Sequence, residues 1–193
     1  IQVGKDNGSL SIYMNGSNKI VVEGNQTGAG YTSATSVTTN GWHHVAVVND
    51  GTANTQTTYI NGAADANTGS RSTAYTYTED TVIIGARWYS SAIKETAYRY
   101  ISNVRITKAK VYTGNFIVPW SPLTAITNCQ LLTCQNSSGA ITDASTNNLT
   151  MTAVGSVAPA TGTVYHAATG IHPFIGQITP PTSKLTAITN TKL

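Results

Sequence analysis

The sequence predicts an all-β protein of the sandwich or barrel type, and three observations lead to this prediction. Charged residues make up only 10% of the 193 residues, whereas an average globular domain carries about 25%. Threonine is abundant, and 17 glycines join many asparagines as turn formers. Between residues 9 and 118, short runs of alternating apolar residues are broken repeatedly by turn signals, which is typical of all-β folds.

The first expected strands flank an Asn-Gly turn. Leu10–Met14 and Lys19–Glu23 lie on either side of Asn15-Gly16, so we expect a hairpin through that turn. The run Trp42–Val48 is apolar on both faces, which predicts a central strand. Because Trp42 opens that run, we expect its side chain to lie in the core.

The remaining expected strands follow in order. Asp50-Gly51 turns the chain, and Thr57–Ile60 leads into Asn61-Gly62. Asn-Gly is the strongest short-range signal for a type I′ hairpin turn, because both central residues need a positive φ angle. Two further strands are expected at Thr81–Ala86 and Tyr100–Thr107.

The composition changes near residue 119, which predicts a domain boundary there. Residues 119–193 contain two early prolines and only three charged residues. Within them the phrase Leu-Thr-Ala-Ile-Thr-Asn occurs at 123–128 and again, letter for letter, at 185–190. Duplication explains this match better than shared composition, so we expect a segment of a modular polypeptide. The predicted domains are a sandwich over 1–118 and a low-charge β-rich extension over 119–193, which could supply strands to this or a neighbouring domain.

Cys129 and Cys134 lie five residues apart in a strand-like run. At about 3.3 Å per residue, their α-carbons would be roughly 17 Å apart, beyond the reach of a disulfide. No histidine is close enough in sequence to complete a metal site with them. The prediction is therefore two buried free thiols.

The sequence lacks a recognisable enzyme motif. Glycoside hydrolysis needs two converging carboxylates, but Glu79 and Asp80 are adjacent and would point apart in a strand. Nucleophile elbows and phosphate-binding glycine loops are absent from the sequence. His43 and His44 occupy successive positions and cannot chelate one ion together. We expect their rings to pack on opposite faces, one beside Trp42 with a hydrogen bond to a backbone group.

Several turns could hold calcium or a sugar. Asp6-Asn7-Gly8, Asn49-Asp50-Gly51 and the pair Asp65 and Asn67 offer carboxylate and amide oxygens, which calcium prefers. No single loop carries three or more acidic ligands, and turn chemistry alone also explains these residues. Calcium is thus an optional cofactor, and no other cofactor is expected.

Two further groups of residues could bind a partner. Arg87, Trp88 and Tyr89 lie in an expected loop, where flat rings beside donors could stack on a sugar, cover core edges or form a subunit contact. Arg99 and Arg105 belong to a basic cluster between residues 87 and 110 in which only Glu95 opposes the charge. Strand alternation would place both arginines on one face, either as solvated surface or as a contact for an anionic partner.

The order of these segments resembles a laminin-G-like domain of the concanavalin A-like lectin/glucanase superfamily. The resemblance covers residues 3–118 and rests on Gly41-Trp-His-His-Val-Ala-Val-Val48, Thr58-Tyr-Ile-Asn-Gly62, Val82-Ile-Ile-Gly85 and Tyr100-Ile-Ser-Asn-Val-Arg-Ile106. It implies an antiparallel jelly-roll β-sandwich. Gln130–Cys134 and Thr142–Thr150 resemble the opening strands of such domains in tailed-phage structural proteins, which also carry the phrase Pro-Leu-Thr-Ala-Ile of 122–126.

The resemblance directs the functional prediction. The glucanase branch is recognised by alternating Glu and Asp in a strand, which this sequence lacks. We therefore expect a non-enzymatic structural or adhesion module of a phage surface protein such as a fibre, spike or capsid-decorating protein. Its expected partners are other virion subunits in a homo-oligomer, with a trimer favoured. The alternative is a lectin that binds host-surface glycans through loops near Asp50, Asp65 and Trp88, and a bacterial adhesin is a third reading.

Two classes of partner are not expected. The net charge of +3 is too small and scattered for a nucleic-acid groove. No uninterrupted apolar run approaches the roughly 18 residues of a spanning helix.

Overall fold

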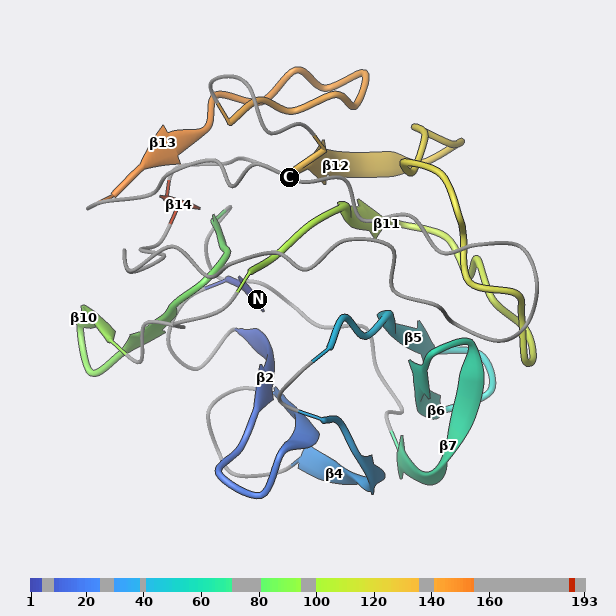
Figure 1. The fold of residues 1–193 in the computed structure, drawn as a ribbon. Helices are drawn as coiled ribbons and strands as arrows, with labels where there is room; N and C mark the ends of the chain where they lie inside the picture. The colour runs from blue at the N-terminus through green and yellow to red at the C-terminus, as the bar shows by residue number, and fades with distance from the viewer. Residues whose placement is uncertain are drawn as a thin grey trace. The chain divides into compact units, whose positions relative to one another are not determined.

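The structure, a computed structural model, describes residues 1–4, 9–24, 30–38, 41–70, 81–94, 100–135, 141–154 and 188–189. The described residues form strands and contain no helix, which confirms the all-β class and agrees with a concanavalin A-like β-sandwich. No helix in this part of the chain could cross a membrane. The strands, labelled where there is room in Figure 1, are β1 (Gln2–Val3), β2 (Leu10–Met14), β3 (Lys19–Gly24), β4 (Gly30–Ser36), β5 (Val45–Asp50), β6 (Thr55–Ile60), β7 (Ala63–Ser70), β8 (Val82–Ile83), β9 (Arg87–Tyr89), β10 (Ala92–Lys94), β11 (Val104–Thr107), β12 (Cys129–Thr133), β13 (Thr152–Ala153) and β14 (Ile188–Thr189).

The chain divides into two compact units, each made of separate segments. The first unit contains Ile1–Glu79, Tyr89–Ser91 and Lys110–Val118. The second contains Asp80–Trp88, Ala92–Ala109 and Pro119–Leu193. The predicted domains, 1–118 and 119–193, divide the chain differently and stay a prediction.

Two antiparallel sheets build the first unit. In one, β4, β3, β2 and β1 lie side by side in that order, and in the other β6 lies between β5 and β7. Inward-facing residues alternate along the strands, so that Ile12 lies opposite Val22 and Met14 opposite Ile20. These side chains, with others from both sheets, form one apolar core. Its members are Ile20, Val22, Val37 and Ile60, with Leu10, Ile12, Met14, Tyr31 and Val47 packed against them.

The two predicted Asn-Gly hairpins both form, and their turns differ. Asn61 and Gly62 have φ angles of 52° and 83° between β6 and β7, which confirms the type I′ turn. The first hairpin, predicted between Leu10–Met14 and Lys19–Glu23 through Asn15-Gly16, is also confirmed, because β2 and β3 pair antiparallel on either side of these residues. Asn15 still pairs with Lys19 through its amide, and the positive φ of 58° belongs to Asn18. The loop is therefore a three-residue turn that ends in a left-handed residue.

The strand predicted at Trp42–Val48 begins later and is not central. β5 starts at Val45, pairs with β6 from Val45 opposite Ile60 to Asp50 opposite Thr55, and lies at one side of the described three-stranded sheet. Trp42 precedes the strand and is half-buried rather than fully enclosed. The apolar run was therefore a poor guide to where the ladder begins.

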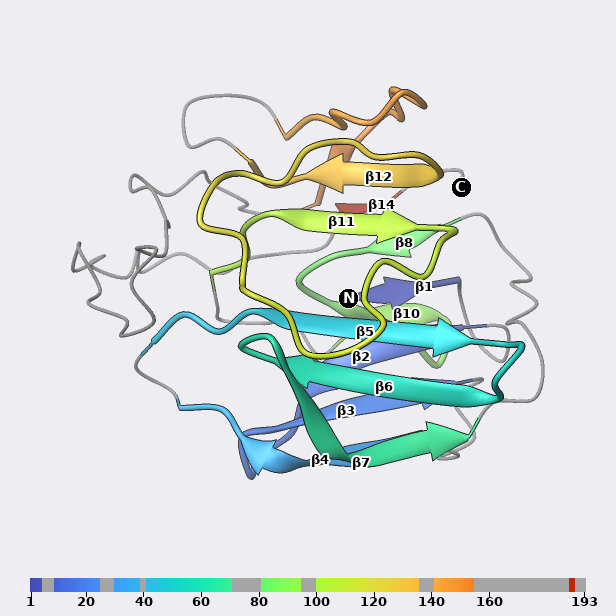
Figure 2. The same cartoon turned by 90° about the vertical axis from the view of Figure 1, so that its right-hand side faces the viewer.

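In the second unit, β11 pairs antiparallel with β12, with Val104 opposite Thr133 and Ile106 opposite Leu131. Figure 2 shows the two strands side by side. The extension thus supplies a strand to a segment that was assigned to the sandwich. β11 begins only at Val104, so the strand predicted from Tyr100 is wrong in its first half, and β8 covers only two residues of the predicted Thr81–Ala86. The second copy of the repeat contributes β14, which pairs with β13.

Both cysteines are free, as predicted. Cys129 is buried at 4% exposure, whereas Cys134 follows β12 at a φ of 59° and is only half-buried. Burial raises the pKa of the Cys134 thiol, and this keeps it in the unreactive protonated form.

Candidate functional site

Asp65 was predicted to lie in a rim loop, and this prediction is wrong. It lies on β7, is only 6% exposed, and joins that strand to β4. Its Oδ1 accepts hydrogen bonds from the amides of Ala34 and Asn67 at 2.7 and 3.0 Å, and its Oδ2 accepts one from Thr35 at 2.9 Å. Asn67 donates its side-chain amide to the carbonyl of Thr32 at 2.9 Å. The two residues therefore fasten the edges of two sheets.

Matching bulges bring these groups together. Where β4 pairs with β3, the register slips between Lys19 and Val21 of β3, so that residues 33–35 of β4 lie opposite one residue. Where β7 pairs with β6, it slips between Thr57 and Tyr59 of β6, so that residues 65–67 of β7 lie opposite one residue. A bulge leaves amides outside the ladder and increases the local twist. The released amides of Ala34 and Thr35 then point to Asp65 instead of to a neighbouring strand. The sequence did not predict this arrangement, because the extra residues of the two bulges show no pattern of apolar residues.

The hydrogen bonds also set the ionisation of Asp65. Burial by itself raises the pKa of a carboxyl group, but the amides of Thr35 and Ala34 outweigh burial and hold the pKa of Asp65 below its ordinary value. Both oxygens of the carboxylate are already occupied by N–H donors. A calcium ion or a sugar hydroxyl would have to displace these donors.

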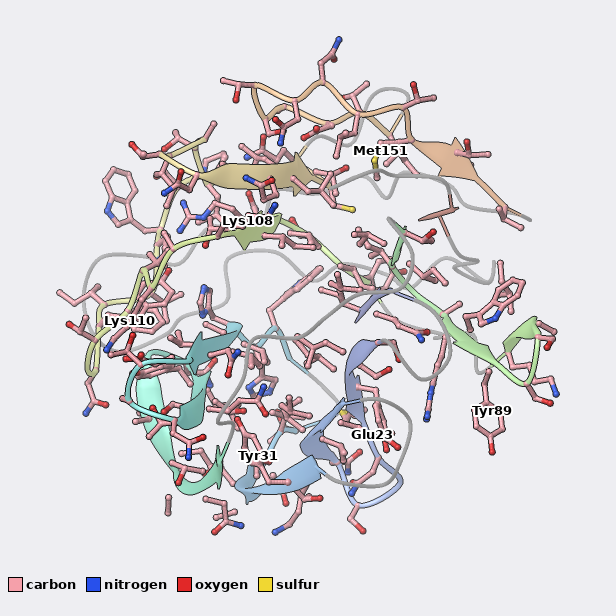
Figure 3. All side chains as sticks on the ribbon, turned by 180° about the vertical axis from the view of Figure 1, so that it is seen from behind. Glu23, Tyr31, Tyr89, Lys108, Lys110 and Met151 are labelled. Atoms are coloured by element: carbon pink, nitrogen blue, oxygen red, sulfur yellow. The ribbon has the colours of Figure 1, made fainter. Side chains whose placement is uncertain are left out.

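Asp50 lies at the end of β5, at the turn where it was predicted. Its Oδ1 accepts the amides of Thr52 and Ala53, each at 3.0 Å, and its Oδ2 lies 2.5 Å from the Nζ of Lys110. The hydrogen bond from Lys110 is the main reason that the pKa of Asp50 is lowered. Figure 3 labels Lys110 beside this turn. The expectation that only Glu95 opposes the basic cluster is thus wrong, because Asp50 neutralises Lys110.

The histidine pair joins a turn and an aromatic cluster. The Nε2 of His43 contacts Thr38 Oγ1 at 2.9 Å, and its Nδ1 contacts the side-chain amide of Asn61 at 3.1 Å. His43 therefore bonds to side chains, and the hydrogen bond from one of the two histidines to a backbone group stays a prediction. His44 packs edge-on against Phe116, which stacks on Tyr112 with ring centroids 3.6 Å apart. Neither histidine is arranged to bind a metal, and the described residues contain no group of three or more metal-ligating side chains.

The predicted loop at Arg87, Trp88 and Tyr89 is a strand. β9 and β10 form a hairpin whose turn residues, Ser90 and Ser91, both have positive φ angles, 51° and 60°. Successive strand residues point to opposite sides, so Trp88 and Tyr89 cannot form one ledge. Trp88 packs against Ile83 and Ala86. Tyr89 is 45% exposed and projects outward in Figure 3.

Arg105 is held in the structure, whereas Arg99 lies outside the described residues. The Nη1 of Arg105 donates to the carbonyl of Thr124 at 3.1 Å. Residues 101–103 are not in a strand, and the alternation that placed the two arginines on one face is therefore unsupported. The turn Asp6-Asn7-Gly8 also lies outside the described part of the chain.

Asp143 is a structural anchor that the site prediction missed. It is 7% exposed, and its carboxylate accepts the amides of Leu132, Ser145 and Leu149 at 2.8 to 2.9 Å, and the hydroxyl of Ser145 at 2.7 Å. Burial tends to raise the pKa of Asp143, but hydrogen bonds led by that from Leu132 leave it lowered. The signal in the sequence was the pattern Asp-x-Ser-x-Asn of 143–147.

The loop around Asp143 covers the outer edge of β12. Leu132 donates its amide to Asp143 and accepts the amide of Ala144 at 2.7 Å. The carbonyl of Gln130 accepts hydrogen bonds from Asn147 at 3.0 Å and Ser145 at 3.3 Å. Assembly through an open edge of β12 in the low-charge extension is therefore not supported, because this loop fills the edge.

Each of the four described carboxylates accepts hydrogen bonds from within the protein. Glu23 accepts a hydrogen bond from Tyr13 at 3.4 Å, and Asp50, Asp65 and Asp143 hold the donors given above. No two of these four acids bond to a shared group in the described contacts. Among the predicted sugar residues, Asp50, Asp65 and Asn67 hold the hydrogen bonds given above, and Trp88 packs against Ile83 and Ala86. Arg87 and Tyr89 lie on β9, with the ring of Tyr89 exposed.

Comparison with known proteins agrees with this fold. Residues 1–114 match the laminin-G-like family described as the concanavalin A-like lectin/glucanases superfamily. That family suggests a carbohydrate-binding or adhesion-type module. Because the match covers more than half of the chain, the chain belongs to this superfamily. No curated protein and no solved structure matches it significantly.

Proposed function

We propose that the chain is a non-enzymatic structural and adhesion module displayed on the surface of a virion, as in tailed phages. One observation carries the non-enzymatic part of the proposal. The described carboxylates are taken up by hydrogen bonds within the protein, three of them from backbone amides. Acid–base catalysis on a glycoside needs a pair of carboxylates that faces the substrate instead.

The surface role rests on the organisation of the sequence. The family suggests adhesion or carbohydrate binding, and the repeated phrase at 123–128 and 185–190 favours a modular parent polypeptide. A low-charge surface rich in threonine and asparagine suits permanent assembly with other subunits. On this proposal the partners are virion subunits, including further copies of this chain.

The second candidate is a lectin, and the exposed ring of Tyr89 favours it. An aromatic ring at a hairpin tip, held next to two serine hydroxyls, can stack on a sugar face. On this reading Arg99 and Arg105 could contact acidic glycans, and calcium could take part at a turn such as Asp6-Asn7-Gly8.

A glycan array with and without chelator separates the two candidates. The structural proposal predicts no glycan signal above background and no release of reducing ends from β-glucans. A glycan signal that falls in Tyr89→Ala but not in Lys94→Ala would favour the lectin. Hydrolysis of any arrayed glycan would overturn the non-enzymatic assignment.

A further inference from the structure

The described residues 123–135 and 141–150 are connected to one another by hydrogen bonds. Gln135 donates its side-chain amide to the carbonyl of Leu123, and the amide of Cys129 donates to Ile126. The loop around Asp143 is fastened to β12 as described above. These bonds hold the first copy of the repeat, β12 and the edge-covering loop together, and we call this unit the complementing segment.

The complementing segment binds to residues 102–108, which we call the acceptor. The β11–β12 ladder runs from Val104 to Thr107. Further bonds extend it at both ends, because Leu123 donates its amide to Asn103 Oδ1 at 3.0 Å and Asn128 accepts the amide of Lys108 at 3.0 Å. Leu131 and Leu132, at 0% and 2% exposure, are buried in the completed structure.

Residues 117–122, which we call the hinge, connect the complementing segment to the residues that precede it. Before the hinge, the amide of Phe116 donates a hydrogen bond to the carbonyl of Gly62 at 2.9 Å. The side-chain oxygen of Asn115 accepts a hydrogen bond from the amide of Ala64. After the hinge, Leu123 is fixed to the acceptor. Between these anchors Ile117 is 90% exposed and Trp120 is 61% exposed. Pro119 and Pro122 favour an extended chain at the residues that precede them.

We propose that copies of this chain assemble by exchanging the complementing segment, so that β12 of one copy pairs with β11 of another. This inference rests on the proposed structural role and specifies its mechanism. When the whole chain after the hinge is exchanged together with the segment, the described hydrogen bonds of the segment and the acceptor are kept, and only the hinge changes course. In a symmetric pair the two hinges would run past each other, and Ile117 and Trp120 would gain apolar neighbours.

The alternative route, pairing of free strand edges, is less available. The outer edge of β12 is covered by the Asp143 loop, and the Asp65 contacts occupy the bulged parts of β4 and β7. Because covered edges resist pairing between chains, we expect the second copy to pair through the β11–β12 ladder that the fold already contains. Its occupant is therefore a second copy of this chain rather than an unrelated protein.

A mixed-disulfide experiment on the full chain tests the exchange. Thr107 lies opposite Cys129 in the ladder, and facing residues on antiparallel strands are within disulfide reach. One chain carries Thr107→Cys with Cys129→Ala and Cys134→Ala, and the other carries only Cys134→Ala. The two chains have different tags, are co-expressed and are oxidised with diamide. A control replaces Thr107→Cys by Thr113→Cys, an exposed position outside the ladder.

Exchange predicts a disulfide-linked heterodimer at about tenfold or more the yield of the Thr113→Cys control, because paired residues have a high effective concentration. A further variant carries Thr107→Cys with Cys129 retained and Cys134→Ala. If it oxidises only within monomers, the register is correct and exchange is overturned. Light scattering on the unoxidised chain distinguishes a failure of the exchange proposal from a failure of the proposed assembly. An oligomer without heterodimer contradicts exchange alone, and a monomer at high concentration contradicts both exchange and assembly.

Discussion

At the scale of single residues, the Asp65 carboxylate joins two sheet-edge strands through amide hydrogen bonds. It fills a position where each bulge has released a donor, and a donor without a partner is costly once buried. Asp50 has a similar set of partners but sits at an exposed turn, where ion pairs contribute little. The two residues therefore form a natural comparison.

We predict that Asp65→Asn lowers the free energy of unfolding by about 2 kcal/mol, because a side-chain amide would face the amide of Thr35. Asp50→Asn, the control, should cost clearly less, because ion pairs at an exposed turn contribute little. Urea denaturation at neutral pH measures both. Equal losses in the two variants would contradict the role assigned to Asp65.

The pH dependence follows from the same residue. The folded pKa of Asp65 lies below its ordinary value of 3.8, so its stabilising contribution is complete above that value. The contribution is lost as the pH falls through the lower, folded pKa. Asp65→Asn should therefore lose less stability than the wild type as the pH falls through this acidic range. The lowered pKa of Asp143 contributes to the loss of stability in both proteins.

At the scale of elements, the turns show what sequence patterns capture. Asn61-Gly62 was predictable because the type I′ turn depends on its own two residues. The turn at Ser90-Ser91 was missed because serine rarely adopts positive φ, so Arg87–Tyr89 was interpreted as a loop. β4 and β7 were also missed, since their Gly, Ser, Thr and Ala residues lack the apolar alternation that identified β2 and β3.

Gly62 gives an element-scale prediction. At its φ of 83°, an added Cβ would lie 2.1 Å from the carbonyl oxygen of Phe116, whereas a Cβ on Gly51 meets no atom within 4 Å. Gly62→Ala should therefore destabilise the protein by about 2 kcal/mol or more, and Gly51→Ala should change stability by less than about 1 kcal/mol. Thermal unfolding of the pair measures the difference. If both variants have the same melting temperature, Gly62 and the carbonyl of Phe116 do not make this close contact.

At the scale of the whole molecule, the limits of the family match and the limits of the compact units differ. The match ends at residue 114, yet the second unit combines matched residues such as β11 with β12 from the extension. Sequence composition placed a boundary at 119 because charge disappears there. Composition carries no information about which strand completes which ladder, and that pairing was not predictable from it.

We predict that a chain truncated after residue 118 does not fold, because it lacks β12 and exposes the buried face of Val104, which is 5% exposed in the intact fold. A chain truncated after residue 154 keeps β12 and the Asp143 loop and should fold. Proton NMR spectra distinguish the two through the dispersion of their amide signals. A well-dispersed spectrum from the shorter chain would show that residues 1–118 are independent of the extension.

The covered edge of β12 has a consequence for aggregation at high protein concentration. A strand whose outward amide and carbonyl are already engaged gives an arriving chain no template, so collisions between neighbours do not nucleate cross-β growth. The aspartate that closes this edge keeps its charge in all but strongly acidic solution. At high concentration, encounters between copies at this edge would then become more frequent without converting into irreversible aggregates.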